Sequence, residues 1–285
     1  MDLAEVNALD ATIKQNVIEK IMALEDFFTA DIVFYYGQIY NNVIPLYKKL
    51  IHEIYFKSDK KYSRLVIFLN TPGGSVETVE KFADINRNFY KEVYFIVPEQ
   101  AMSAGTVFCL SGDKIFMDYA SSLGPIDPQI FNGKQYVPAL GYLDKIQEFV
   151  EKSNSGIPLN SVELFFLQQQ DIAFLRLCEQ QKSLTVNLIE KWLVEYGFKN
   201  NEENLTLEEQ TQQAKDIAEK LGDNSQWLSH GRYINIKRLK EMGLNIEDYS
   251  NDENLSKLIR EYNDLLTSYI IRGNMTFFLN SKIYF

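Results

Sequence analysis

A serine set among small residues stands out at Ala101-Met102-Ser103-Ala104-Gly105-Thr106, just after an apolar stretch at residues 93–97. A glycine pair, Gly73-Gly74, follows an earlier apolar stretch at residues 65–69. A serine is a weak nucleophile unless a base takes its proton and N–H donors stabilise the developing oxyanion. The two segments together predict a hydrolytic site. Ser103 would be its nucleophile, and the backbone N–H groups of Ala104 and of Gly74 or Ser75 would form the oxyanion hole.

The elements that must position these residues alternate along the first part of the chain. Alternating strands and helices indicate parallel βαβ units, and strands that are apolar throughout indicate a sheet covered on both faces. Sites in such sheets form at the carboxyl ends of the strands, where both the glycine pair and Ser103 are expected. The predicted strands are residues 31–36, 65–69, 93–97 and 113–117, and the predicted helices are residues 10–28, 42–56, 76–90 and 104–110.

The second half of the chain has a different character. Residues 143–220 are rich in Glu, Gln, Lys and Leu and predict two or three helices. A short strand at residues 233–236 and a helix that ends at Gly243 follow. The aromatic segment at residues 267–285 is expected to dock on its own domain as a strand or helix, with contact to a partner or a membrane surface as the alternative.

Composition limits the classes of protein that are possible. The 285 residues are 46% hydrophobic and 24% charged, which is typical of a globular domain. The net charge of −10 argues against nucleic acid as a partner. Two distant cysteines, an acidic N-terminus without signal-peptide character and no long apolar run predict a cytoplasmic protein without a transmembrane segment. The sequence contains no Gly-x-Gly-x-x-Gly motif, and no cofactor or metal is expected.

Three motifs carry a resemblance to a known family. Asn70-Thr71-Pro72-Gly73-Gly74, then the Ser103 segment, then Ser122-Leu123-Gly124-Pro125-Ile126-Asp127-Pro128-Gln129 resemble the serine dehydrogenase proteinase family. This family belongs to the Clp-protease/crotonase superfamily, together with signal peptide peptidase A and the proteolytic subunit of Clp. The resemblance covers residues 30–145, with a weaker match at residues 229–244.

The resemblance implies an α/β fold: a Clp/crotonase-like spiral of ββα units with a mostly parallel sheet, plus a helical C-terminal region. The expected division is a catalytic core at residues 1–145, a helical insertion or oligomerisation region at 146–222, and a closing strand-helix unit with the C-terminal tail at 223–285. The resemblance also makes Ser103 the nucleophile and Gly74 and Ala104 the oxyanion hole. Its expected groove residues are Gly73, Ser75, Gly124, Pro125 and Asp127.

The general base is the open question. Clp-type subunits carry their histidine in the segment that here reads Gly124-Pro125-Ile126-Asp127-Pro128, which contains none. Signal peptide peptidase A instead uses a lysine further along the chain. Lys145, 42 residues after Ser103, fits this pattern best, ahead of Lys152 and Lys134. Apolar neighbours would lower its pKa by desolvation.

A histidine is the competing base. His230 lies close to the position of the third member of the Clp triad, and Asp127 is a candidate to orient the base. The expected function is therefore an ATP-independent serine peptidase that acts on peptides or proteins as a homo-oligomer, with peripheral membrane contact possible. The alternatives are an inactive peptide-binding scaffold of the same fold and a crotonase-like acyl-CoA enzyme. The serine in the Ala-Met-Ser-Ala-Gly segment disfavours the acyl-CoA enzyme.

Overall fold

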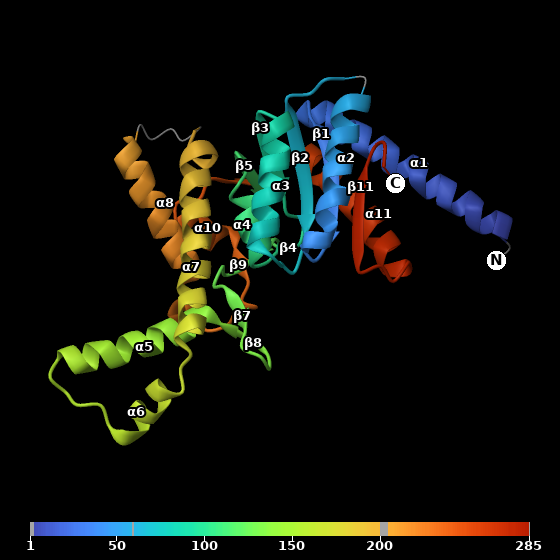
Figure 1. Ribbon diagram of the computed structural model, residues 1–285. Helices are drawn as coiled ribbons and strands as arrows, with labels where there is room; N and C mark the ends of the chain where they lie inside the picture. Colours follow the sequence, from blue (N-terminus) through green and yellow to red (C-terminus); the bar gives the residue numbers. More distant parts are fainter. Residues whose placement is uncertain (1–2, 59, 200–204, 285) are drawn as a thin grey trace.

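The computed structural model describes residues 3–58, 60–199 and 205–284, and it is built on a mostly parallel six-stranded sheet (Figure 1). The strand order is β10-β5-β3-β2-β1-β11, and every neighbouring pair is parallel except β1 with β11. The predicted α/β class, its mostly parallel sheet and all four predicted core strands are confirmed. The strands are β1 (Asp31–Gly37), β2 (Arg64–Asn70), β3 (Glu92–Ile96), β5 (Lys114–Met117), β10 (Ile246–Asp248) and β11 (Phe277–Ser281).

The two edge strands come from the last part of the chain. β11 pairs antiparallel with β1, with Val33 opposite Ser281, so the aromatic C-terminal segment docks on its own sheet. β10 pairs parallel with β5, with Ile246 opposite Ile115. The expected docking of residues 267–285 on their own domain is thus confirmed for β11. β10 was not predicted, because it is short and depends on a partner that is distant in sequence.

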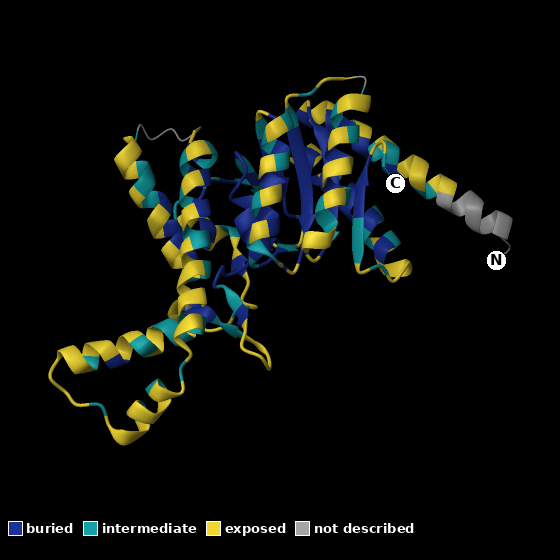
Figure 2. Cartoon of the chain, in the orientation of Figure 1, coloured by how far each residue is buried: buried dark blue, intermediate teal, exposed yellow. Residues whose placement is uncertain are grey.

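Alternate residues of the central strands point to opposite faces of the sheet. In β1, Val33 and Tyr35 join one apolar cluster and Ile32 and Phe34 join another. The first cluster packs under α2 (Ile44–Lys57), α3 (Val76–Phe89) and α4 (Ala104–Cys109), and the second under α1 (Leu3–Phe28) and α11 (Glu253–Arg272). Burial on both faces explains why these strands are apolar throughout (Figure 2).

In the described part of residues 139–222, four helices follow the core, where two or three were predicted. The extra helix is α6, which is short and begins with a capping box between Asn160 and Glu163. α7 and α8 bury Leu188 and Ile217 in the same cluster as the central sheet, whereas α5 and α6 form a largely exposed arm (Figures 1 and 2). The boundary expected after residue 145 falls inside α5, and the three-part division stays a prediction. The helices are α5 (Ala139–Asn154), α6 (Ser161–Gln168), α7 (Ile172–Trp192) and α8 (Leu207–Gly222).

Smaller elements complete the chain. β4 (Gln100–Ala101), β6 (Ser122–Leu123) and β9 (Ile234–Asn235) form a second sheet, and β7 (Gln129–Phe131) and β8 (Tyr136–Pro138) form a hairpin. Two short helices, α9 (Asn224–Trp227) and α10 (Ile236–Glu241), flank β9, and the predicted helix end at Gly243 has φ +95°. Single turns lie at Asn41–Val43, Leu193–Gly197 and Tyr249–Asn251. Over the described ranges, no helix is both long enough and apolar enough to traverse a bilayer.

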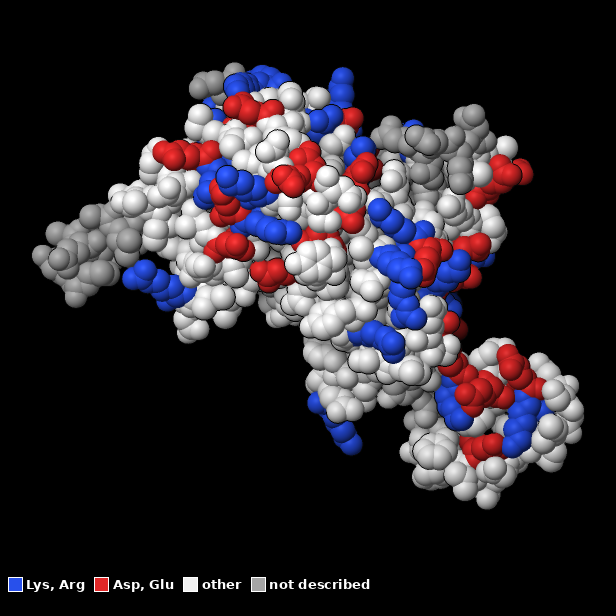
Figure 3. Space-filling model, turned by 180° about the vertical axis from the view of Figure 1, so that it is seen from behind, with Lys and Arg blue, Asp and Glu red and all other residues white. Residues whose placement is uncertain are grey.

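Charged side chains of both signs cover the surface. The chain has 39 acidic and 29 basic residues, and the face shown in Figure 3 carries both kinds interspersed.

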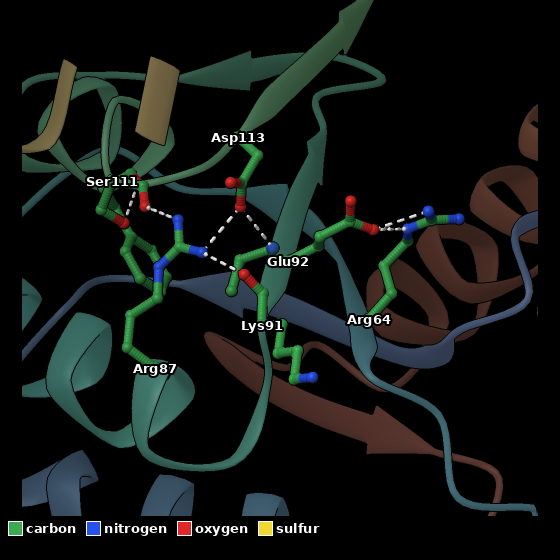
Figure 4. A network of polar contacts seen from close by, with 8 residues as sticks. Arg64, Arg87, Lys91, Glu92, Ser111 and Asp113 are labelled. Atoms are coloured by element: carbon green, nitrogen blue, oxygen red, sulfur yellow. Dashed lines mark hydrogen bonds and ion pairs between the residues drawn. The ribbon is translucent and has the colours of Figure 1, made fainter. Parts of the chain in front are cut away.

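A largely buried ion pair joins α3 to the start of β5 (Figure 4). Arg87 of α3 donates from Nη1 to Asp113 Oδ2 at 2.7 Å and from Nη2 to the carbonyl of Ser111 at 2.6 Å. Asp113 also accepts from the backbone N–H of Val93 at 2.8 Å, and the guanidinium stacks 3.5 Å from the ring centroid of Tyr196. Because both charges are satisfied, the pair fixes α3, β3 and the turn after α7 relative to one another.

The buried carboxyl of Asp31 makes the free energy of unfolding depend on pH. Asp31 is 2% exposed and accepts from the Tyr90 hydroxyl at 2.8 Å. Burial raises its pKa to about 7; the Tyr90 hydrogen bond lowers it and the charge of Glu25 raises it further. In the unfolded chain an aspartate titrates near ~3.9, so between about pH 4 and pH 7 the native state binds more protons. The free energy of unfolding therefore falls as pH rises through this window.

We expect Asp31→Asn to stabilise the protein by roughly 4 kcal/mol at pH 8, with the gain shrinking towards pH 4. Thermal unfolding of both proteins at several pH values measures this difference. Asp26→Asn is the control, since Asp26 forms an exposed ion pair with Lys60 at 2.8 Å. Equal stability of wild type and Asp31→Asn at pH 8 would show that the buried carboxyl ionises without penalty.

Candidate active site

Ser103 lies on a strained turn between β4 and α4. Its φ of 53° and ψ of −118° belong to a backbone region that residues other than glycine rarely adopt. The turn is held by hydrogen bonds from the Gly105 N–H to the Met102 carbonyl at 2.8 Å and from the Val107 N–H to the Ser103 carbonyl at 3.2 Å. A strained strand-to-helix turn of this kind is how α/β hydrolases project a nucleophilic serine.

The Gly73-Gly74 turn lies directly against Ser103. The Thr71 N–H donates to the Gln100 carbonyl at 3.0 Å, and the Met102 N–H donates to the Thr71 carbonyl at 2.9 Å, so the two turns are hydrogen-bonded together. A Cβ added at Gly73 would lie 2.8 Å from Ser103 Cβ and 3.3 Å from the Ala104 nitrogen. The two predicted segments therefore meet at the carboxyl ends of their strands, and only glycine fits at this contact.

Two backbone amides beside Ser103 are free to bind an anion. The Ser75 N–H already donates to the Ile39 carbonyl at 3.0 Å, and this removes it as a candidate donor. In the part of the chain that the structure describes, the N–H groups of Gly74 and Ala104 have no hydrogen-bond acceptor. Ala104 is also the first residue of α4, where the amide points out of the helix end. The sequence left open whether Gly74 or Ser75 is the donor beside Ala104, and of these two only the Gly74 N–H is available.

His230 pairs with Asp127 although the two residues are 103 positions apart in the chain. Nδ1 of His230 lies 2.7 Å from Oδ1 of Asp127. Asp127 is 1% exposed, and its other oxygen accepts from Gln129 Nε2 at 2.8 Å. A carboxylate that binds Nδ1–H fixes the tautomer and leaves Nε2 free to accept a proton.

Short tertiary contacts hold this pair near the serine turn. β9, which follows His230, pairs antiparallel with β6, which precedes Asp127. The buried Thr106 hydroxyl of α4 donates to the Gly124 carbonyl at 2.8 Å, and the Gly124 N–H returns a bond of 2.9 Å to Thr106 Oγ1. The segment that carries Asp127 is thus tied to the same helix that begins at Ser103.

One cavity of about 640 Å³ brings these residues together. Ser103, Ala104, Gly74, Ser75 and His230 all line it. Of the predicted groove residues, Ser75 is in the wall. The other four are buried and do not line the cavity: Gly73, Gly124, Pro125 and Asp127. Neighbouring residues such as Ile126 and Pro128 line it instead.

The three lysines considered as bases lie elsewhere. Lys145 of α5 is 59% exposed, pairs with Glu148, and lines a separate apolar cavity of about 360 Å³ with Phe149 and Phe166. Lys152 pairs with Glu163 at 2.7 Å, and Lys134 is exposed in the β7–β8 turn. None of the three lines the Ser103 cavity, so the structure gives no support to Lys145 as the base.

Sequence reasoning missed several residues of the cavity wall. Tyr40 follows β1, Tyr136 lies in the β7–β8 hairpin and Gln181 lies in α7. Glu77 of α3 lies in the same wall. Only Glu77 had a signal, its closeness to Gly74 in the chain, because the others come from segments without a motif.

This arrangement is a serine-hydrolase type of site on an α/β sheet. A serine on a strained turn, two free amides and a carboxylate-bound histidine share one cavity. Residues 11–157 match the family model of the ClpP-like SDH-type serine proteinases, and the chain belongs to this family. The family resemblance and the ClpP-like fold predicted from the sequence are confirmed.

Relatives in sequence extend beyond this chain. It is 28% identical over 181 residues to the uncharacterized protein MJ0137 of Methanocaldococcus jannaschii, covering 64% of this chain and 52% of the relative. It is 27% identical over 181 residues to MJ1495 of the same organism, covering 63% and 51%. The chain spans about half the length of these curated relatives. Among solved structures, a mutant of the 1510-N membrane-bound stomatin-specific protease is similar at 14% identity and a TM-score of 0.47, over 80% of this chain and 81% of that chain.

Proposed function

We propose that this protein is an active serine peptidase with Ser103 as nucleophile, His230 as general base and Asp127 as the residue that orients His230. Ser103 Oγ attacks the carbonyl carbon of a peptide bond as its proton passes to His230 Nε2. The N–H groups of Gly74 and Ala104 donate to the oxyanion. The tetrahedral intermediate expels the amine with the proton returned by His230, and water then releases the acyl group from Ser103 by the same steps in reverse.

The single observation that carries this proposal is the 2.7 Å contact between His230 and Asp127 beside the cavity that Ser103 lines. It supports a histidine in preference to Lys145, since a base must reach the proton it accepts. The free Gly74 and Ala104 amides support the oxyanion hole in the same way.

Two other functions compete with a peptidase. A catalytically inactive peptide-binding scaffold has the same fold, and it is disfavoured because a scaffold has no need of a strained serine beside a histidine–carboxylate pair. A crotonase-like acyl-CoA enzyme also uses a two-amide oxyanion hole. The strained Ser103 between those amides disfavours it as well.

A fluorophosphonate probe tests the proposal directly. We expect the folded protein to be modified at Ser103, and Ser103→Ala to abolish the modification, because the probe reacts only with an activated serine. Intact-mass measurement and peptide mapping identify the modified residue, and Ser155→Ala, at the end of α5 and outside the cavity wall, is the control that should keep labelling. A folded wild-type protein that stays unmodified would favour the inactive scaffold.

The proposal also covers the substrates, the assembly and the location of the protein. Peptides or proteins are the substrates, and the exposed apolar residues Val162, Leu164 and Phe165 on α6 support association into a homo-oligomer. The two cysteines are buried and unpaired, and burial raises the pKa of the Cys109 thiol. Buried thiols of this kind support a cytoplasmic location.

A further inference from the structure

Glu77 is fixed in the wall of the Ser103 cavity by residues of two helices. It lies in the first turn of α3, three residues after the oxyanion-hole candidate Gly74. Ser75 Oγ donates to Glu77 Oε2 at 2.8 Å, and Gln181 Nε2 of α7 donates to Glu77 Oε1 at 3.1 Å. Each carboxylate oxygen thus has a side-chain donor that holds it in place, while the Glu77 side chain itself stays exposed at the cavity.

The carboxyl of Glu77 is ionised at neutral pH. Partial burial acts to raise its pKa, but hydrogen bonds from its own backbone N–H, from Gln181 and from Ser75 hold the pKa below the ordinary value. The first turn of a helix favours a negative charge for the same reason.

No other acidic or basic side chain, His230 apart, is found among the described residues that line this cavity. The remaining walls are apolar, aromatic or neutral. Three aromatic side chains at the cavity are at least half exposed: Tyr40, Phe131 and Tyr136, at 50%, 53% and 72%. A substrate that fills the cavity thus meets a single fixed negative charge between apolar surfaces.

We infer that Glu77 is a specificity-determining residue, which selects peptides with a lysine or arginine side chain next to apolar or aromatic ones. This inference rests on the proposed peptidase function. An ammonium or guanidinium group donates N–H hydrogen bonds to the Glu77 carboxylate, and the aromatic side chains cover the aliphatic part of the peptide. An acidic side chain in the same place is repelled by Glu77.

Competing covalent probes test the inference. The probes are tripeptidyl diphenyl phosphonates that carry lysine, norleucine or glutamate at each position in turn, and a small neutral fluorophosphonate is the reference. At one of the three peptide positions, we expect the wild type to react about tenfold faster with the lysine probe than with the norleucine probe, and most slowly with the glutamate probe. Glu77→Gln should remove this preference, and Glu77→Lys should reverse it. Glu80→Gln, on the same helix but outside the cavity wall, should keep it.

The outcomes separate the inference from the function on which it rests. If the wild type reacts with the neutral probe but shows no charge preference, or if Glu77→Gln keeps the preference, the role of Glu77 is wrong and the peptidase stands. If no probe modifies the folded wild type, the peptidase proposal fails and the inference fails with it. Equal reaction of Glu77→Gln and wild type with the neutral probe shows that the variant is folded and that the effect is one of selection.

Discussion

His230→Ala is expected to slow fluorophosphonate labelling of Ser103 by about 10²- to 10⁴-fold, the usual contribution of a general base. The reason is that His230 is the cavity residue whose ring is oriented by a buried carboxylate, through the 2.7 Å contact with Asp127. Without it, the Ser103 hydroxyl keeps its proton and reacts only as fast as the oxyanion hole alone allows. Second-order labelling rates, measured by mass spectrometry over a time course, give the ratio.

Lys145→Ala is the decisive comparison. Lys145 is exposed on α5 and paired with Glu148, so its removal should leave the labelling rate within about twofold of wild type. Circular dichroism and thermal unfolding of both variants exclude loss of the fold as the cause. If Lys145→Ala loses labelling and His230→Ala keeps it, the histidine assignment is wrong and the lysine predicted from the sequence is the base.

Gly74→Ala is expected to reduce labelling by about 10²- to 10³-fold, the usual effect of losing one oxyanion donor. A Cβ at this position would lie 2.0 Å from the Ile39 carbonyl oxygen, so the backbone must shift and the N–H no longer points at the oxyanion. The φ of +149° adds strain for any residue with a side chain. Labelling rates and the thermal unfolding midpoint together measure the effect.

Gly133→Ala separates the effect of backbone strain from the effect of the clash at Gly74. Gly133 also has a positive φ, of +89°, but nothing lies within 4 Å of the place its Cβ would take. This variant should lose a little stability and keep its labelling rate, because it carries the backbone strain without the clash. Should Gly74→Ala label as fast as Gly133→Ala, the Gly74 amide is not an oxyanion donor.

The order of strands and helices in the first half of the chain was predictable because it follows from local patterns of apolar residues. Residues of β1, β2 and β3 are apolar on both faces, and strands buried on both faces have few alternatives to a covered parallel sheet. The turns that carry Gly73 and Ser103 follow two of these strands, so their meeting at one edge of the sheet follows from topology. Prediction was weaker for β10, β11 and α6, which are short and depend on distant partners.

The base was beyond what the sequence could decide. Lys145 satisfied a spacing rule, yet α5 carries it into the exposed arm and away from Ser103. His230 and Asp127 are 103 residues apart, and a two-residue pairing of β6 with β9 brings their segments together. Such a pairing has no periodicity of its own and leaves no local signal in the sequence.

The sequence by itself therefore determined the family, the sheet and the serine and glycine turns, because each depends on neighbours within a few residues. Only the tertiary structure decided which side chains share the cavity with Ser103: His230 with Asp127 behind it, and Glu77 with Gln181. These contacts join elements far apart in the chain, and they form only when the two faces of the sheet are covered and the closing segment packs against the core.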